Sequence, residues 1–184
     1  MERRALLRLA GTGVLWLGLA AHSPYRQWEV YRKTRLVVLV SAAENDSVLL
    51  GGRLAAIYQE QLPSSGATMA RARDTNDALR LIASRQLDVA VLRSTDAHAA
   101  FTGERPYGDN GALPLRALAV LGDYLFVCRE DLPAASAYLL TEALAKRWRD
   151  IDPALVRAAR GPRPRAPLAI PLHPGAQEYY RDHP

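Results

Sequence analysis

Between residues 36 and 101, apolar residues follow two alternating patterns. Residues 36–40 form a continuous run of valine and leucine, which is typical of a strand buried on both faces. Between such runs, apolar residues recur every three or four positions, which predicts helices with one buried face. The expected elements are strands at 36–40, 67–72 and 87–92 and helices that begin near Ser47, Asp74 and Ser94.

The rest of the chain predicts a loop, two strands and a long helix. Residues 102–114 are rich in Gly, Pro, Asp and Asn, a composition typical of a loop. Two apolar runs at 115–121 and 124–128 are separated only by Gly122 and Asp123. The remaining expected elements are a helix with Pro133 in its first turn and an exposed linker at residues 161–165.

This alternation of strands and helices predicts the fold class. Strand–helix–strand units form a mostly parallel sheet with helical crossovers, which is an α/β fold. We therefore expect residues 36–184 to form a single α/β lobe, preceded by a separate leader at residues 1–35.

Hydroxyl side chains follow the expected strands at the ends where α/β proteins bind ligands. The carboxyl edge of a parallel sheet carries loops and helix N-termini whose free N–H groups favour anions such as carboxylates. The candidate ligand-binding residues are Ser41, Ser47, Thr75, Ser94 and Thr95. The alternative role for Ser47, Thr75 and Ser94 is to cap the helices that begin there, since Ser and Thr are preferred caps.

Motifs for catalysis or metal binding do not occur in the sequence. It contains no GxSxG, GxxxxGK[ST], HExxH or GxGxxG motif, and its four histidines are scattered. Cys128 is the only cysteine and is expected to be a buried, inert thiol. His173 is expected to be a loop histidine hydrogen-bonded near a helix start at Gly175 rather than a general base. We expect no enzymatic activity, no cofactor and no metal.

The positive charge of the chain is confined to its first residues. The whole sequence has 24 basic and 19 acidic residues, for a net charge of +5. Residues 1–35 hold seven of the basic residues and two acidic ones, so the remaining 17 basic and 17 acidic residues leave the body neutral. A neutral body lacks the basic surface that phosphate contacts require, so we expect no nucleic-acid partner.

The leader has the pattern of an export signal. A basic segment is followed by residues 9–25, which carry no charge, and Gly18 and Ala20 supply small residues for a signal peptidase. The run is also close to the length of a spanning helix, so a cleaved signal and a retained inner-membrane anchor are both open. A third alternative is a buried helix at the edge of the domain. Export predicts a periplasmic body.

Several segments of the body resemble one protein family. Residues 74–84 with 87–91, the segment 129–133, and above all 171–176 with Tyr179 and Tyr180 look like corresponding segments of the TAXI-type solute-binding proteins of TRAP transporters. The resemblance implies a periplasmic-binding-protein-like lobe. It also implies capture of a small organic acid or amino acid and delivery to membrane permease subunits.

The sequence departs from that family in two places. The family builds a second lobe between segments like 115–121 and 124–129, whereas here only Gly122 and Asp123 join them, so the second lobe is expected to be missing. In addition, Glu44 and Asp46 stand in the first loop, where they would repel a carboxylate. The alternative function is therefore an interaction or scaffold module on the membrane surface, or self-association, through the uncovered face. An exposed apolar patch around Tyr124 and Phe126 would favour it.

Overall fold

A computed structural model describes residues 35–108, 111–157, 159–164 and 168–184. The leader lies outside these residues, and so do the predictions of an export signal or anchor. Within the described part of the chain, no helix combines the length and the apolar character needed to cross a bilayer.

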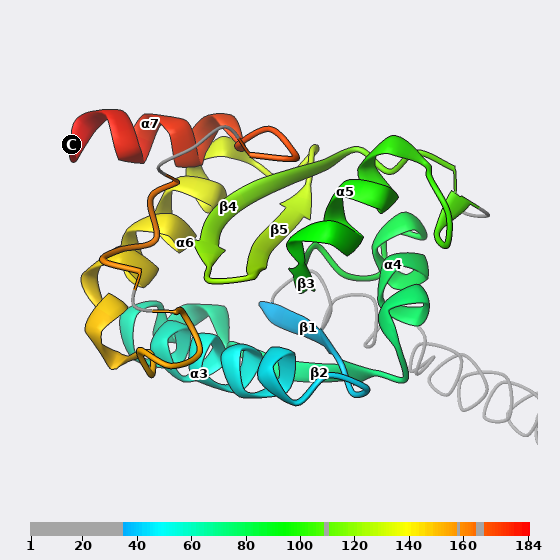
Figure 1. The fold of residues 1–184 in the computed structure, drawn as a ribbon. Helices are drawn as coiled ribbons and strands as arrows, with labels where there is room; N and C mark the ends of the chain where they lie inside the picture. The colour runs from blue at the N-terminus through cyan, green and yellow to red at the C-terminus, as the bar shows by residue number, and fades with distance from the viewer. Residues whose placement is uncertain (1–34, 109–110, 158, 165–167) are drawn as a thin grey trace, which may run out of the picture. The chain divides into compact units, whose positions relative to one another are not determined.

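The body contains one five-stranded sheet, in the order β2-β1-β3-β5-β4 (Figure 1). β1 lies parallel to both β2 and β3, whereas β5 lies antiparallel to β3 and to β4. The sheet is therefore mixed and open. The expected α/β fold class is confirmed, but the expected mostly parallel sheet was wrong, since β5 pairs antiparallel with both β3 and β4. The strands are β1 (Val37–Ser41), β2 (Thr68–Ala72), β3 (Val89–Arg93), β4 (Leu115–Leu121) and β5 (Tyr124–Arg129).

Helices cover both faces of the sheet, as Figure 1 shows. One core contains buried residues of α3, α6 and α7, and a second core, on the other face, contains buried residues of α4 and α5. Two short 3-10 turns, at Pro63–Ser65 and Trp148–Asp150, complete the regular structure of these residues. The helices are α3 (Asn45–Gln61), α4 (Thr75–Ala83), α5 (Ser94–Thr102), α6 (Ala134–Lys146) and α7 (Pro174–Asp182).

The two cores follow from the alternation of side chains along each strand. In β1, Val38 and Val40 point into the core with α3 and α6, whereas Leu39 points into the core with α4 and α5. A strand buried on both faces must be apolar at every position, which explains the continuous run at residues 36–40. Tyr58 of α3 is fully buried, and its hydroxyl donates to the Leu140 carbonyl of α6 at 3.2 Å.

β4 and β5 form a tight hairpin. Leu121 pairs with Tyr124, so Gly122 and Asp123 alone form the turn. Gly122 has a φ of 66°, a left-handed conformation that suits glycine at a two-residue turn. Tyr124 and Phe126 are both buried. The Phe126 ring packs against the ring of Tyr58 in α3, with the ring centroids 5.9 Å apart. Tyr124 and Phe126 therefore form no exposed apolar patch in the described part of the chain.

The C-terminal segment returns to the sheet along β4. The Ala117 N–H donates to the Pro171 carbonyl at 2.9 Å, and the His173 N–H donates to the Ala117 carbonyl at 2.8 Å. The segment thereby covers part of an edge strand whose polar groups would otherwise be open. The Pro162 carbonyl accepts a hydrogen bond from the Val120 N–H of β4, and Pro162 is buried. The prediction of an exposed linker at residues 161–165 was therefore wrong at Pro162.

His173 caps α7, as the sequence predicted. Its Nδ1 accepts the Gly175 N–H at 3.2 Å, and its Nε2 lies 2.9 Å from the Leu132 carbonyl oxygen. These partners assign the neutral tautomer with the proton on Nε2. Burial lowers the pKa of the His173 imidazole from its usual value of 6.5.

We therefore expect acid to destabilise the protein through His173. Because the pKa is lower in the folded chain, the unfolded chain binds more protons below about pH 6.5, and stability falls as the pH falls. Urea unfolding midpoints between about pH 7.5 and about pH 5.5 measure this loss. An His173→Asn variant keeps an acceptor for the Gly175 N–H but has no proton to bind, so its midpoint should depend less on pH. Identical pH dependence in the two proteins would contradict this role.

Candidate functional site

The sheet has a topological switch point between β1 and β3. α3, which follows β1, lies on one face of the sheet, whereas α5, which follows β3, lies on the other. Chains that leave neighbouring strands toward opposite faces open a crevice at the carboxyl ends of those strands, where α/β proteins bind ligands. The candidate site is therefore the carboxyl edge around Ser41, which ends β1, and Arg93, which ends β3.

Ser41 is a buried site residue whose hydroxyl is unpaired among the described residues. Its side chain is 2% exposed, and its hydroxyl has no hydrogen-bond partner among the described residues. A buried hydroxyl without a partner costs about 1–3 kcal/mol, so native proteins rarely retain one without a reason. Its position at the end of β1 makes a polar ligand the natural partner.

Ser47 and Ser94 bind backbone instead. The Ser47 hydroxyl is buried and donates to the Val91 carbonyl of β3 at 3.1 Å, which ties α3 to the sheet. The Ser94 hydroxyl donates to the Asp123 carbonyl of the β4–β5 turn at 2.9 Å. Neither residue is the expected N-cap, since α3 follows Glu44 and α5 follows Arg93 without a side-chain cap. Their hydroxyls thus bind backbone carbonyls, and that they bind ligand stays a prediction.

Thr75 and Thr95 begin helices on the α4–α5 face. Thr75 is half-buried at the start of α4, whose cap is Asp74, and it lies near the Tyr107 hydroxyl. The same hydroxyl lies near the Asp96 carboxylate of α5. Thr95 is exposed in the first turn of α5. Thr75 thus belongs to a polar chain at the carboxyl edge, and Thr95 is open to solvent beside it.

Arg93 and Glu44 place a charged pair at the same edge. The Arg93 Nε lies 3.2 Å from a Glu44 carboxylate oxygen, and its guanidinium carbon lies 5.1 Å from the centroid of the Tyr124 ring. Strand register explains the second contact, because Arg93 and Tyr124 are directly paired between β3 and β5. Glu44, expected to repel a carboxylate, is thus neutralised by Arg93.

Tyr124 adds a second buried hydroxyl. The residue is 3% exposed, and among the residues that the structure describes its oxygen has no partner of normal hydrogen-bond geometry, although it lies near the Glu44 carboxylate. Burial, followed by the nearby Glu44 charge, raises the pKa of Tyr124 to about 12. The phenol is therefore protonated at neutral pH and can donate to an acceptor such as a carboxylate.

The charges of the edge favour a ligand that carries a carboxylate. A guanidinium presents a planar set of N–H donors that matches a carboxylate in a bidentate arrangement. Burial raises the pKa of Asp96 from its usual value. An ammonium group could be accepted by Glu44 or Asp46. The arrangement suits an organic acid or an amino acid.

Sequence reasoning missed Arg93, Tyr124 and Tyr107. Arg93 was visible as a cation directly after a predicted strand, which is a usable signal. Tyr124 reaches the edge only because β5 runs antiparallel to β3, and Tyr107 arrives on an irregular loop. Neither position leaves a periodic pattern in the sequence.

Other chemistry has less support at this site. No group of three or more His, Cys, Asp or Glu side chains in the described part of the chain is arranged to hold a metal ion. Cys128 is buried in β5, and burial raises the pKa of its thiol far above the usual value.

Comparisons with known proteins do not assign the chain to a family. No model of a known protein family matches the sequence. No curated protein matches it either.

Proposed function

We propose that the chain is an exported, single-lobe solute-binding protein of the TAXI type that binds a small organic acid or amino acid at the carboxyl edge of its sheet. It would pass this solute to membrane permease subunits of a TRAP-type transporter. The mixed α/β sheet with helical crossovers supports a periplasmic-binding-protein-like lobe, and the resemblance of residues 74–91 and 171–180 supports the family.

One observation carries the proposal. The buried Ser41 hydroxyl lacks a partner at a topological switch point, and Arg93 stands at the end of the neighbouring strand. A carboxylate could take one hydrogen bond from Ser41 and two from Arg93, with Glu44 released to solvent. One carboxylate would then provide a hydrogen-bond acceptor for the buried Ser41 hydroxyl and a counter-ion for the Arg93 guanidinium.

The turn between β4 and β5 sets the expected affinity. It lies at the same edge, so a second lobe inserted between Leu121 and Tyr124 would have closed over the site. With Gly122 and Asp123 alone, the ligand stays open to water on one side. Small-ligand affinity depends on burying most of the ligand surface, so we expect weak, millimolar binding.

We expect Ser41→Ala to remove ligand binding without lowering stability. The Ser41 hydroxyl makes no hydrogen bond to the described residues, so its removal eliminates a buried unsatisfied group. The free energy of unfolding should therefore stay equal or rise, by about 1 kcal/mol at most. The test is a thermal-shift titration of the full chain with dicarboxylates, 2-oxo acids and amino acids, since binding to the native state alone raises the melting temperature.

Saturable stabilisation of the wild type by one of these classes, absent in Ser41→Ala, supports the proposal. Ser94→Ala is the matched control, because its hydroxyl binds the Asp123 carbonyl and the variant should lose stability but keep the ligand response. No stabilisation by any acid, with a cooperative melt, would contradict the proposal. The alternative, an interaction or scaffold module, stays a prediction, although Tyr124 and Phe126 are buried and supply no apolar patch for it.

A further inference from the structure

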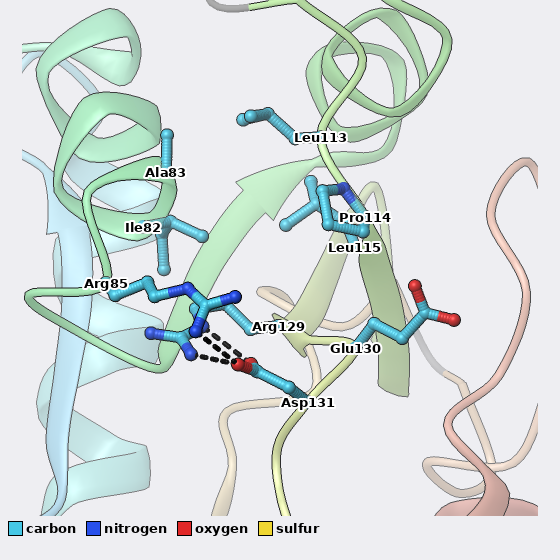
Figure 2. A pocket seen from close by; sticks show the side chains of 9 residues that line it. All are labelled: Ile82, Ala83, Arg85, Leu113, Pro114, Leu115, Arg129, Glu130 and Asp131. Atoms are coloured by element: carbon cyan, nitrogen blue, oxygen red, sulfur yellow. Dashed lines mark hydrogen bonds and ion pairs between the residues drawn. The ribbon is translucent and has the colours of Figure 1, made fainter.

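A pocket lies at the opposite edge of the sheet from Ser41 and Arg93, where α4 ends and β4 begins (Figure 2). Its volume is about 220 Å³. Figure 2 shows Ile82 and Ala83 of α4 on one side and residues 113–115 on the other, with Arg85, Arg129 and Asp131 gathered below them. The lining residues are Ile82, Ala83, Arg85, Leu113, Pro114, Leu115, Arg129, Glu130 and Asp131.

The walls of this pocket are apolar. Ile82, Leu113 and Leu115 are all buried residues of the core that contains α4 and α5. Apolar walls with a few polar groups at one end are the usual construction of a small-ligand site. The volume is below that of typical drug-sized sites, so it suits a compact molecule.

The acidic groups at the rim are already paired. The Arg129 side chain is 15% exposed, and its Nε–H donates to Asp131 at 2.8 Å while another of its nitrogens binds the second Asp131 oxygen. Arg129 also lies 3.4 Å from Asp88, and Arg116 binds Glu130. These bidentate and charge-assisted contacts leave no carboxylate at the rim in need of a cation.

Arg85 forms a weaker ion pair with Asp131 than Arg129 does. Its guanidinium approaches Asp131 only at 3.6 Å, and its side chain is 75% exposed. Asp131 already accepts the closer bonds of Arg129. An exposed pair of this kind contributes little stability, so Arg85 can turn to another anion at small cost.

The backbone at Arg85 has a conformation that glycine would adopt with less strain. Arg85 has a φ of 59° where α4 ends, and the neighbouring N–H groups of Arg85 and Gln86 return to carbonyls of the last turn. This left-handed position after a helix is usually glycine, because a Cβ is strained there. Strained residues persist most often where a side chain has a use.

We propose that this pocket binds a small carboxylate with a compact apolar body, whose carboxylate is held by Arg85 while the body lies between Ile82 and Leu115. Arg129 and Asp131 hold each other and position the rim. The site is separate from the carboxyl edge and does not depend on the function proposed for that edge.

The test uses benzoate as the probe and benzyl alcohol as its neutral counterpart, measured by calorimetric titration of the full chain. Wild type should bind benzoate saturably and benzyl alcohol at least about tenfold more weakly, since the charged hydrogen bonds are lost. Arg85→Gly should weaken benzoate binding by about tenfold or more and should not lower the melting temperature. This combination separates a ligand contact from a structural role.

Two further variants complete the design. Ala83→Leu fills the pocket on an exposed helical position and should also abolish benzoate binding, although Arg85 is intact. Lys146→Gln removes an exposed cation on α6 that pairs with Glu142, and it should bind benzoate as wild type does. Absence of saturable benzoate binding in the wild type would overturn the proposal, as would equal binding of benzyl alcohol or full binding by Arg85→Gly.

Discussion

Replacing Gly175 with alanine is expected to cost about 3 kcal/mol or more of unfolding free energy, at the upper end of overpacking effects. A Cβ at this position would lie 2.1 Å from the Ala134 carbonyl oxygen and 2.9 Å from the Tyr138 nitrogen. These are backbone atoms of α6, so no side-chain rotation relieves the clash. α7 must therefore move away from α6, and the packing of Tyr179 against Tyr138 is lost.

Urea unfolding monitored by circular dichroism measures this effect. Gly161→Ala is the matched control, because a Cβ there meets nothing within 4 Å, and its midpoint should equal that of the wild type. If Gly175→Ala unfolded at the wild-type midpoint, close contact of α6 with α7 would be refuted, and with it the anchoring of the C-terminal segment.

The second large effect is expected from Arg93→Gln. This change removes the cation at the carboxyl edge and leaves Glu44, whose side chain is only 18% exposed, without its ion pair. An acid ligand then loses two charge-assisted hydrogen bonds and faces an unpaired carboxylate, so its affinity should fall by about 100-fold or more. Calorimetric titration of the full chain with the acid class that stabilises it measures the loss.

Glu44→Gln gives the opposite expectation. It leaves Arg93 with no ion pair to break, so acid affinity should rise above that of the wild type. Arg80→Gln is the control, since Arg80 pairs with Asp77 on the surface of α4 and its loss should leave acid binding unchanged. Equal acid binding by Arg93→Gln and Arg80→Gln would remove Arg93 from the site.

The elements of the fold were largely predictable from the sequence. Apolar runs located β1 and β3, and two further apolar runs located β4 and β5, although their antiparallel pairing as a hairpin was not predicted. These features depend on local chain properties: burial on both faces and a turn that needs a left-handed residue. The helix expected to begin near Asp74 is α4, and the Asp74 carboxylate caps it by accepting the Asp77 N–H at 2.8 Å.

The site was less predictable because its contacts join distant segments. Ser47 and Ser94 look like helix caps or ligand donors in sequence, but their hydroxyls bind the carbonyls of Val91 and Asp123, which only the folded sheet brings near. Tyr124 meets Arg93 through antiparallel register, which the sequence does not encode locally. The hydroxyl residues at strand ends therefore indicated where the proposed site lies, but not which side chains form it.

The most direct test of ligand binding at the carboxyl edge is an amide NMR titration of the full chain with the acid class that raises its melting temperature. We expect saturable shifts centred on Ser41, Thr75 and Arg93, with the amide signals of α6 and α7 unmoved. Shifts confined to residues away from this edge, or no saturable shift at all, would contradict the proposed function.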